Sequence, residues 1–286
     1  MAEELEIKLT LTREGLVRAH EWLEAQSEAV RGPQKSLLNR YYDTPESELN
    51  SQRAALRVRQ AGDRCVQTLK TQGEFVGGAH RREEWEWPVP GTDLNLGLLA
   101  DTPLGDGINL ARLQPVFETN FTRQIIMLRQ GDTEIEVALD QGAIVSGDSS
   151  RPLSEVEFEL KSGDPSALIT WAGRLAGQVP VFLNLVSKAE QGYYLAGLYT
   201  PDARHPGSPG PVSATDFLYG LSVSWLTGQP YAVSDLDLSD VARLAEQGGF
   251  GDLYSDIIAS LGAGVSVATL MEQQALGKLQ ILLATS

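Results

Sequence analysis

Charged and apolar residues alternate along several segments of this sequence, and this alternation restricts the fold more than any other feature. In the segments 4–8, 56–59 and 155–161, a Glu, Lys or Arg recurs at every second position with apolar residues between. Side chains at positions i and i+2 of a β-strand point to the same face. Each segment therefore predicts a strand with one charged face and one apolar face.

The charged faces place like charges two positions apart, chiefly in Glu-x-Glu runs. Such neighbours destabilise a sheet unless something neutralises them. Divalent cations bind carboxylate oxygens, and the Arg and Lys residues of other strands suit phosphate oxygens. A sheet with one face in water accounts for any single strand of this kind. At least five such strands in one chain favour a sheet that closes around a polar lumen, with helices covering its apolar outside.

The pattern of strands and helices fits such a sheet. Helical spacing follows Thr12, a candidate cap, at 13–26, and recurs at 165–177 and 187–198. The stretch 93–112 is irregular, with helical pieces. Strands are predicted at 3–12, 36–42, 54–61, 64–72, 80–89, 115–130, 132–145 and 152–161.

The chain divides near residue 201, where Pro, Gly and Ser gather and predict a linker over 201–212. We expect a barrel domain at 1–200 and a small all-α region at 213–286. The helices of this region are predicted at 213–226, 239–245, 252–261 and 265–283.

The apolar faces of these C-terminal helices need a partner. The plainest interpretation is a small bundle that packs on the barrel or on another copy of the chain, which would make a homo-oligomer. A regulatory or recruiting role is the alternative.

The composition excludes several classes of function. A net charge of −15 over 286 residues argues against general nucleic-acid binding, which needs a basic surface. No apolar run is long enough to span a membrane, and the acidic start is unlike a secretory signal, so we expect a cytoplasmic protein without a membrane partner. The single cysteine, Cys65, excludes an intrachain disulfide. No P-loop sequence is present.

The charged strands resemble the CYTH superfamily, also called triphosphate tunnel metalloenzymes. The match begins with ELEIK at 4–8, which has the family's E-x-E-x-K pattern. One such run would be weak evidence, but further elements follow in the family's order. They are YYDTP at 41–45, LRVR at 56–59, TLK at 68–70, REEWE at 82–86, FTR at 121–123, EIEVALD at 134–140, EVEFEL at 155–160 and SKAEQGY at 187–193.

The resemblance covers about residues 1–200 and is closest to bacterial inorganic triphosphatases. It implies an α+β fold: an eight-stranded antiparallel β-barrel with covering helices, here followed by a small C-terminal all-α appendage. Many of these relatives continue into a basic helical CHAD domain. The 86 residues after position 200 are too short and too acidic for one, so we carry over no polyphosphate-binding role to them.

The implied activity is hydrolysis of inorganic triphosphate to pyrophosphate and phosphate with Mg²⁺ or Mn²⁺. Metal binding then falls to Glu4, Glu6, Glu157 and Glu159, and substrate binding to Lys8, Arg57, Arg59, Lys70, Arg123 and Lys188. The catalytic candidates, which would orient the attacking water or hold a second metal, are Glu84, Glu86, Glu136 and Asp140.

Several alternatives stay open. Each of the catalytic candidates could instead pair with a neighbouring Arg, and the roles of Arg40 and Arg82 are undecided. The substrate could be thiamine triphosphate or another organic triphosphate, or the activity that of an adenylyl cyclase. A silent polyphosphate-binding module is a third hypothesis, although a pure anion binder gains nothing from a row of glutamates.

Overall fold

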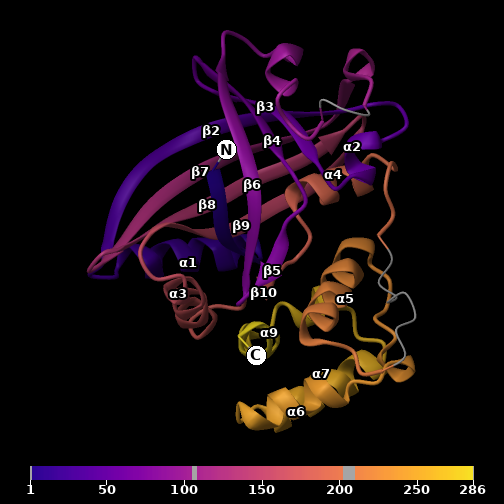
Figure 1. Cartoon of the computed structure of the whole chain (residues 1–286). Coiled ribbons are helices and arrows are strands. Elements are labelled where there is room, and N and C mark those ends of the chain that lie inside the picture. Colours follow the sequence, from indigo (N-terminus) through magenta and orange to yellow (C-terminus); the bar gives the residue numbers. More distant parts are fainter. Residues whose placement is uncertain (1, 105–107, 202–209, 286) are drawn as a thin grey trace.

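Eight antiparallel strands close into a ring in the computed structural model, which describes residues 2–104, 108–201 and 210–285 (Figure 1). The ring closes because β6 pairs with β1 as well as with β4. Its spatial order is β1 (Ala2–Thr10), β9 (Ser149–Ser162), β8 (Thr133–Ser146), β7 (Gln114–Gln130), β2 (Ala29–Asp43), β3 (Ala55–Ala61), β4 (Arg64–Lys70) and β6 (Ala79–Val89).

Two short strands extend this ring, β5 (Glu74–Val76) on β6 and β10 (Phe182–Leu183) on β1. The helices before the C-terminal region are α1 (Arg13–Glu24), α2 (Glu48–Ser51), α3 (Ser166–Ala176) and α4 (Lys188–Leu195), with 3₁₀ turns at Leu96–Leu99 and Leu110–Arg112. The C-terminal region contains α5 (Ala214–Thr227), a 3₁₀ turn (Val233–Asp235), α6 (Ser239–Gln247), α7 (Gly251–Gly262), α8 (Val267–Leu270) and α9 (Gln274–Ala284).

Local sequence signals set where two of these helices begin. Thr12 caps α1, because its hydroxyl accepts a hydrogen bond from the backbone N–H of Gly15. A capping box begins α4: the Ser187 side chain accepts from the N–H of Glu190, and the Glu190 carboxylate accepts from the N–H of Ser187. This box fixes the first residue of α4, Lys188, which points into the barrel.

The fold class predicted from the sequence is confirmed, and all eight predicted strands form. Strand β2 is longer than expected because it pairs with β7 from Ala29 to Asp43. The two-residue strand β10 and the three-residue strand β5 were too short for a period-2 pattern to reveal. The helix predicted at 265–283 is wrong as one unit, since a turn at 271–273 separates α8 from α9. Of the predicted linker, residues 202–209 lie outside the described residues.

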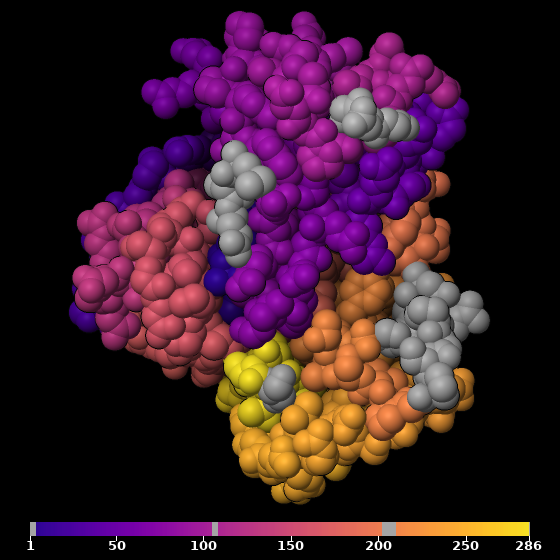
Figure 2. Space-filling view, viewed as in Figure 1, coloured from indigo at the N-terminus to yellow at the C-terminus, as the bar shows by residue number. Residues whose placement is uncertain are grey.

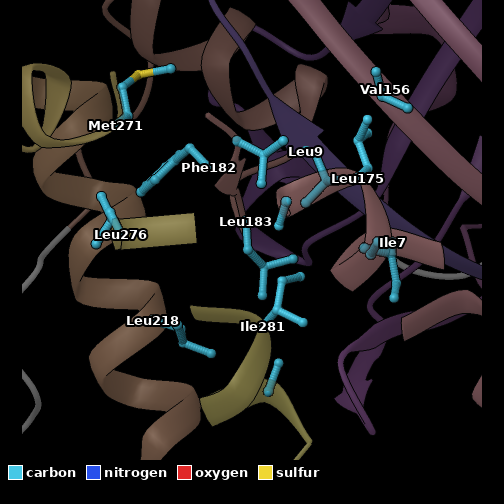
Figure 3. Close-up of a cluster of buried hydrophobic side chains, with 14 of the residues drawn as sticks. Ile7, Leu9, Val156, Leu175, Phe182, Leu183, Leu218, Met271, Leu276 and Ile281 are labelled. Atoms are coloured by element: carbon cyan, nitrogen blue, oxygen red, sulfur yellow. The ribbon is translucent and has the colours of Figure 1, made fainter. Parts of the chain in front are cut away.

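The outer face of the barrel and the C-terminal helices share one hydrophobic core. Ile7 and Leu9 on β1 belong to the same buried cluster as Leu276 and Ile281 on α9, with Phe182 of β10 also in it (Figure 3). Space-filling Figure 2 shows these helices, orange to yellow, as a lobe against the base of the barrel. Of the described helices, none has the length and apolarity needed to cross a membrane.

Polar side chains fix this lobe to the edge of the sheet. The buried Gln280 of α9 bonds the backbone of Leu183 twice, accepting from its N–H at 2.9 Å and donating to its carbonyl at 3.0 Å. The Ser222 hydroxyl accepts from the N–H of Leu185 at 3.0 Å. On the barrel side, Arg151 donates to the Leu226 carbonyl at 2.9 Å and lies 4.3 Å from the Trp225 ring. The helices therefore pair backbone groups that the edge strand β10 would otherwise leave buried and unsatisfied.

Gln280→Leu should lower the free energy of unfolding by about 2 kcal/mol, because two buried backbone groups of Leu183 lose their partners. Urea unfolding measures it as a lower midpoint with an unchanged slope. The control is Gln274→Leu on the same helix, where a half-buried side chain makes a single long hydrogen bond to the Gly177 carbonyl at 3.4 Å. Equal midpoints for the two variants would contradict this role of Gln280.

Candidate active site

The inner face of the barrel surrounds a cavity of about 1700 Å³. Strand registry brings the charged faces of distant segments together there: Glu6 is opposite Glu159, and Glu159 is opposite Glu136 on its other side. Every site residue predicted from the sequence lines this cavity except Asp140. They are Glu4, Glu6, Lys8, Arg57, Arg59, Lys70, Glu84, Glu86, Arg123, Glu136, Glu157, Glu159 and Lys188.

Arg82 pairs with two acids of β1 that line the cavity. Its guanidinium pairs with Glu4 at 3.2 Å and also with Glu6, while Lys70 pairs with Glu4 at 2.6 Å. Burial alone would raise the pKa of Glu6, but the combined attraction of Arg82, Lys70 and Lys8 outweighs it and the pKa falls to about 2. Glu6 is therefore ionised at neutral pH, as a metal ligand or a counter-ion must be.

A second network lies where α4 meets the barrel wall. The Lys188 ammonium is 2.6 Å from Glu157, 2.7 Å from Glu155 and 3.0 Å from Asp140. Arg123 joins the same network, at 2.7 Å from Asp140 and 2.6 Å from Glu157. Burial alone would raise the pKa of Glu157, yet Lys188 and Arg123 hold it well below its usual range.

Asp140 takes part in this network from behind the cavity wall. Its side chain is fully buried, and both its oxygens accept hydrogen bonds from Arg123. We therefore assign it the structural alternative, pairing with a neighbouring Arg, and not the orientation of water in the cavity.

Among the cations that line the cavity, Lys8 and Arg59 on the barrel strands and the exposed Arg53 form no ion pair with a described carboxylate. Burial lowers the pKa of Lys8. Burial, together with repulsion from Arg57 and Arg123, lowers the pKa of Arg59 to about 10. Arg59 therefore remains cationic at neutral pH, and neither side chain forms an ion pair with a described carboxylate. They are therefore the cations most available to an incoming polyanion.

The acids of the lumen suit a hard divalent cation, because their ligand atoms are carboxylate oxygens and because strand registry places several of them side by side. Glu6, Glu159 and Glu136 form a row across β1, β9 and β8. Burial raises the pKa of Glu159, and repulsion from Glu4 and Glu136 adds to this effect, although Lys161 lies 2.5 Å from Glu159 and opposes it. Such a row needs added positive charge. Over the described part of the chain, however, no three His, Cys, Asp or Glu side chains converge closely enough to hold a metal ion. Binding would require the acids to turn from their present partners.

The structure also places residues that the motifs did not assign. Arg82, undecided from the sequence, is central, whereas Arg40 lies outside the cavity in an exposed pair with Glu118. Glu155 shares the strand face of Glu157, so period 2 alone could have added it. Tyr41 lines the cavity, accepts a long 3.4 Å hydrogen bond from Arg57 and stacks on Phe117. Tyr41 is uncharged, so the pattern of charged residues in the sequence did not point to it.

Comparisons with known proteins agree with this geometry. The family model of the CYTH domain matches residues 2–193. An inorganic triphosphatase of Haemophilus influenzae is 34% identical over 197 residues, which cover 68% of this chain and 55% of that protein. The chain thus spans about half the length of this curated relative.

A solved structure supports the fold alone. It is a Hippeastrum protein described as an adenylyl cyclase candidate with a dominant triphosphatase activity, 19% identical to this chain. The alignment covers 67% of this chain and 95% of that one, with a TM-score of 0.50.

Asp140→Asn should lower the free energy of unfolding by about 3 kcal/mol, because it removes a buried charge that faces both Arg123 and Lys188. Glu118→Gln, which breaks the exposed pair with Arg40, should cost less than about 1 kcal/mol. Urea unfolding of the two variants compares them directly. Equal losses would mean that the network behind the cavity wall contributes no more than a surface pair.

Proposed function

This chain belongs to the CYTH domain family, and from that premise we propose that it hydrolyses inorganic triphosphate in the lumen of its barrel. The observation that carries the proposal is the distribution of charge in the cavity. Unneutralised Lys8 and Arg59 share one lumen with the row formed by Glu6, Glu159 and Glu136. A polyanion needs the first group, and a divalent cation needs the second.

Triphosphatases of this family depend on metal in general, and we propose Mg²⁺ or Mn²⁺ here. Glu4, Glu6 and Glu159 would hold the ion, with Glu136 next to them in the row. A bound ion would supply positive charge to the phosphate oxygens and so favour cleavage of the anhydride. Glu157, the fourth predicted ligand, is engaged by Lys188 and Arg123. We propose that it mainly orients these two cations.

The cations divide into two groups by their partners. Arg59 and Lys8 would bind phosphate oxygens directly, with Arg57 beside them, whose nearest carboxylate, Glu84, is 3.9 Å away. Lys70, Arg123 and Lys188 are already paired with acids. They would contribute to the electrostatic field of the lumen and to the position of the substrate more than to direct neutralisation of its charge. Phosphoryl transfer requires mainly this positioning and charge stabilisation.

The attacking water needs a carboxylate that accepts its proton. In this step the water oxygen bonds to a terminal phosphorus, the bridging P–O bond breaks, and pyrophosphate leaves with the electron pair. We propose Glu84, Glu86 or Glu136 for the proton, because all three line the cavity. Glu136 is the most available, since it has no hydrogen bond or ion pair to any described residue.

The identity of the Haemophilus relative supports inorganic triphosphate over an organic one. Thiamine triphosphate hydrolysis, adenylyl cyclase activity and silent polyphosphate binding remain the alternatives. The net charge of −15 supports a small substrate that enters the lumen over a nucleic acid that binds the outside. A cytoplasmic location and contact between copies through the C-terminal helices stay predictions.

Glu6→Gln should lower kcat for tripolyphosphate by about 10²-fold or more, because it removes a charge that holds the metal, on the scale of other electrostatic groups in active sites. Phosphate release with Mg²⁺ or Mn²⁺ measures this, alongside thiamine triphosphate and ATP as competing substrates. The control is the exposed Glu21→Gln on α1, which should leave kcat unchanged.

Four outcomes would contradict the proposal. Faster turnover of thiamine triphosphate would make the enzyme an organic triphosphatase, and cyclic AMP formed from ATP would make it a cyclase. Binding of tripolyphosphate without any phosphate release would make it a binding module. Loss of the folded state in Glu6→Gln, seen by circular dichroism, would make the acid row structural.

A further inference from the structure

The buried amide of Asn39 contacts Arg59, one of the lumen cations without an ion pair to a described residue. Asn39 on β2 is 1% exposed and lies between Arg59 on β3 and Thr119 on β7 in the strand registry. Its Oδ1 accepts a hydrogen bond from Nε of Arg59 at 2.7 Å. Its Nδ2 donates to the Thr119 carbonyl at 2.7 Å. The second bond fixes the orientation of the amide, so the oxygen faces the guanidinium.

Arg59 differs in this respect from two other guanidinium groups of the lumen. Arg82 and Arg123 are each held by carboxylates. For Arg59, by contrast, Nε is bound by a neutral amide, and its Nη groups make no hydrogen bond to a described residue. Arg59 lines the cavity. Arg57 and Arg123 repel it.

We propose that Asn39 is a positioning residue that holds Arg59 toward the substrate without neutralising its charge. The inference rests on the proposed function, because the ligand of Arg59 is taken to be a triphosphate oxygen. An amide is suited to this task since its oxygen accepts from Nε and leaves the outer edge of the guanidinium free. A carboxylate at the same place would hold Arg59 as firmly but would offset the charge that attracts the substrate.

The test is a double-mutant cycle on the full chain, with Mg²⁺ and tripolyphosphate, that compares Asn39→Ala, Arg59→Gln and the double variant. Asn39→Ala should raise KM about tenfold, the scale of one lost charge-assisted hydrogen bond, with a smaller change in kcat. In the Arg59→Gln background, Asn39→Ala should change KM less than about twofold, because its partner is gone. Asn39→Asp, which keeps the size and the acceptor, should raise KM at least as much as Asn39→Ala.

The matched control is Asn184→Ala. Asn184 is also fully buried, and its amide bonds the Thr10 hydroxyl and the Val186 N–H, but unlike the Asn39 amide it makes no hydrogen bond to the side chain of a described lumen cation. This variant should lose stability and keep its KM. Binding of imidotriphosphate, a slowly hydrolysed analogue, measured by calorimetry, should follow the KM series. Asn39→Asp keeps the test valid if Asn39→Ala does not fold.

The inference is overturned if folded Asn39→Ala has the wild-type KM, if its effect persists in the Arg59→Gln background, or if Asn39→Asp binds more tightly than the wild type. A wild-type chain that binds imidotriphosphate without turning over tripolyphosphate overturns the proposed function alone. Absence of both binding and turnover overturns both.

Discussion

Charge compensation inside a closed sheet is the constraint on which the rest of this structure depends. A barrel that turns its charged faces inward must pair them, because unpaired charges in a confined space are costly. Arg82 pairs with the acids of β1, and Lys188 pairs with Glu157 and its neighbours. Among the described residues the pairing is incomplete at two places: Arg59 and Lys8 form no ion pair with an acid, and Glu136 of the acid row forms none with a cation. We interpret this incompleteness as room for a polyanion and a metal, each compensating what the protein leaves open.

Period-2 alternation was sufficient to predict the barrel and most of the cavity wall. The parity of a strand decides which residues face inward, and no long-range information is needed for that. How deeply a side chain is buried and which residue it pairs with cannot be predicted in this way, because both depend on registry between strands far apart in sequence. Asp140 has the right parity but lies behind the wall. Asn39 was missed since an uncharged amide stands out in no charge pattern, and Arg82 gained its importance only when β6 was seen to pair with β1.

The C-terminal helices contribute to the barrel from outside. Gln280 and Ser222 bind backbone groups next to β10, and α9 shares its core with β1 (Figure 3). Residues on α5, among them Asp216 and Tyr219, also line the edge of the cavity. The region predicted as an appendage is thus part of one continuous core with the barrel. Helical spacing in the sequence predicted the apolar faces of these helices. No pattern in the sequence predicted the edge strand β10 that the helices cover.

A crystal structure of the chain with Mn²⁺ and imidotriphosphate tests the central claim most directly, since anomalous scattering locates the metal independently of the ligand. The account predicts a Mn²⁺ peak beside Glu6 and Glu159, and phosphate oxygens within hydrogen-bond distance of Arg59 and Lys8. A metal and ligand bound on the outer surface, or a ligand in the lumen that contacts only the cations already paired with acids, would contradict it.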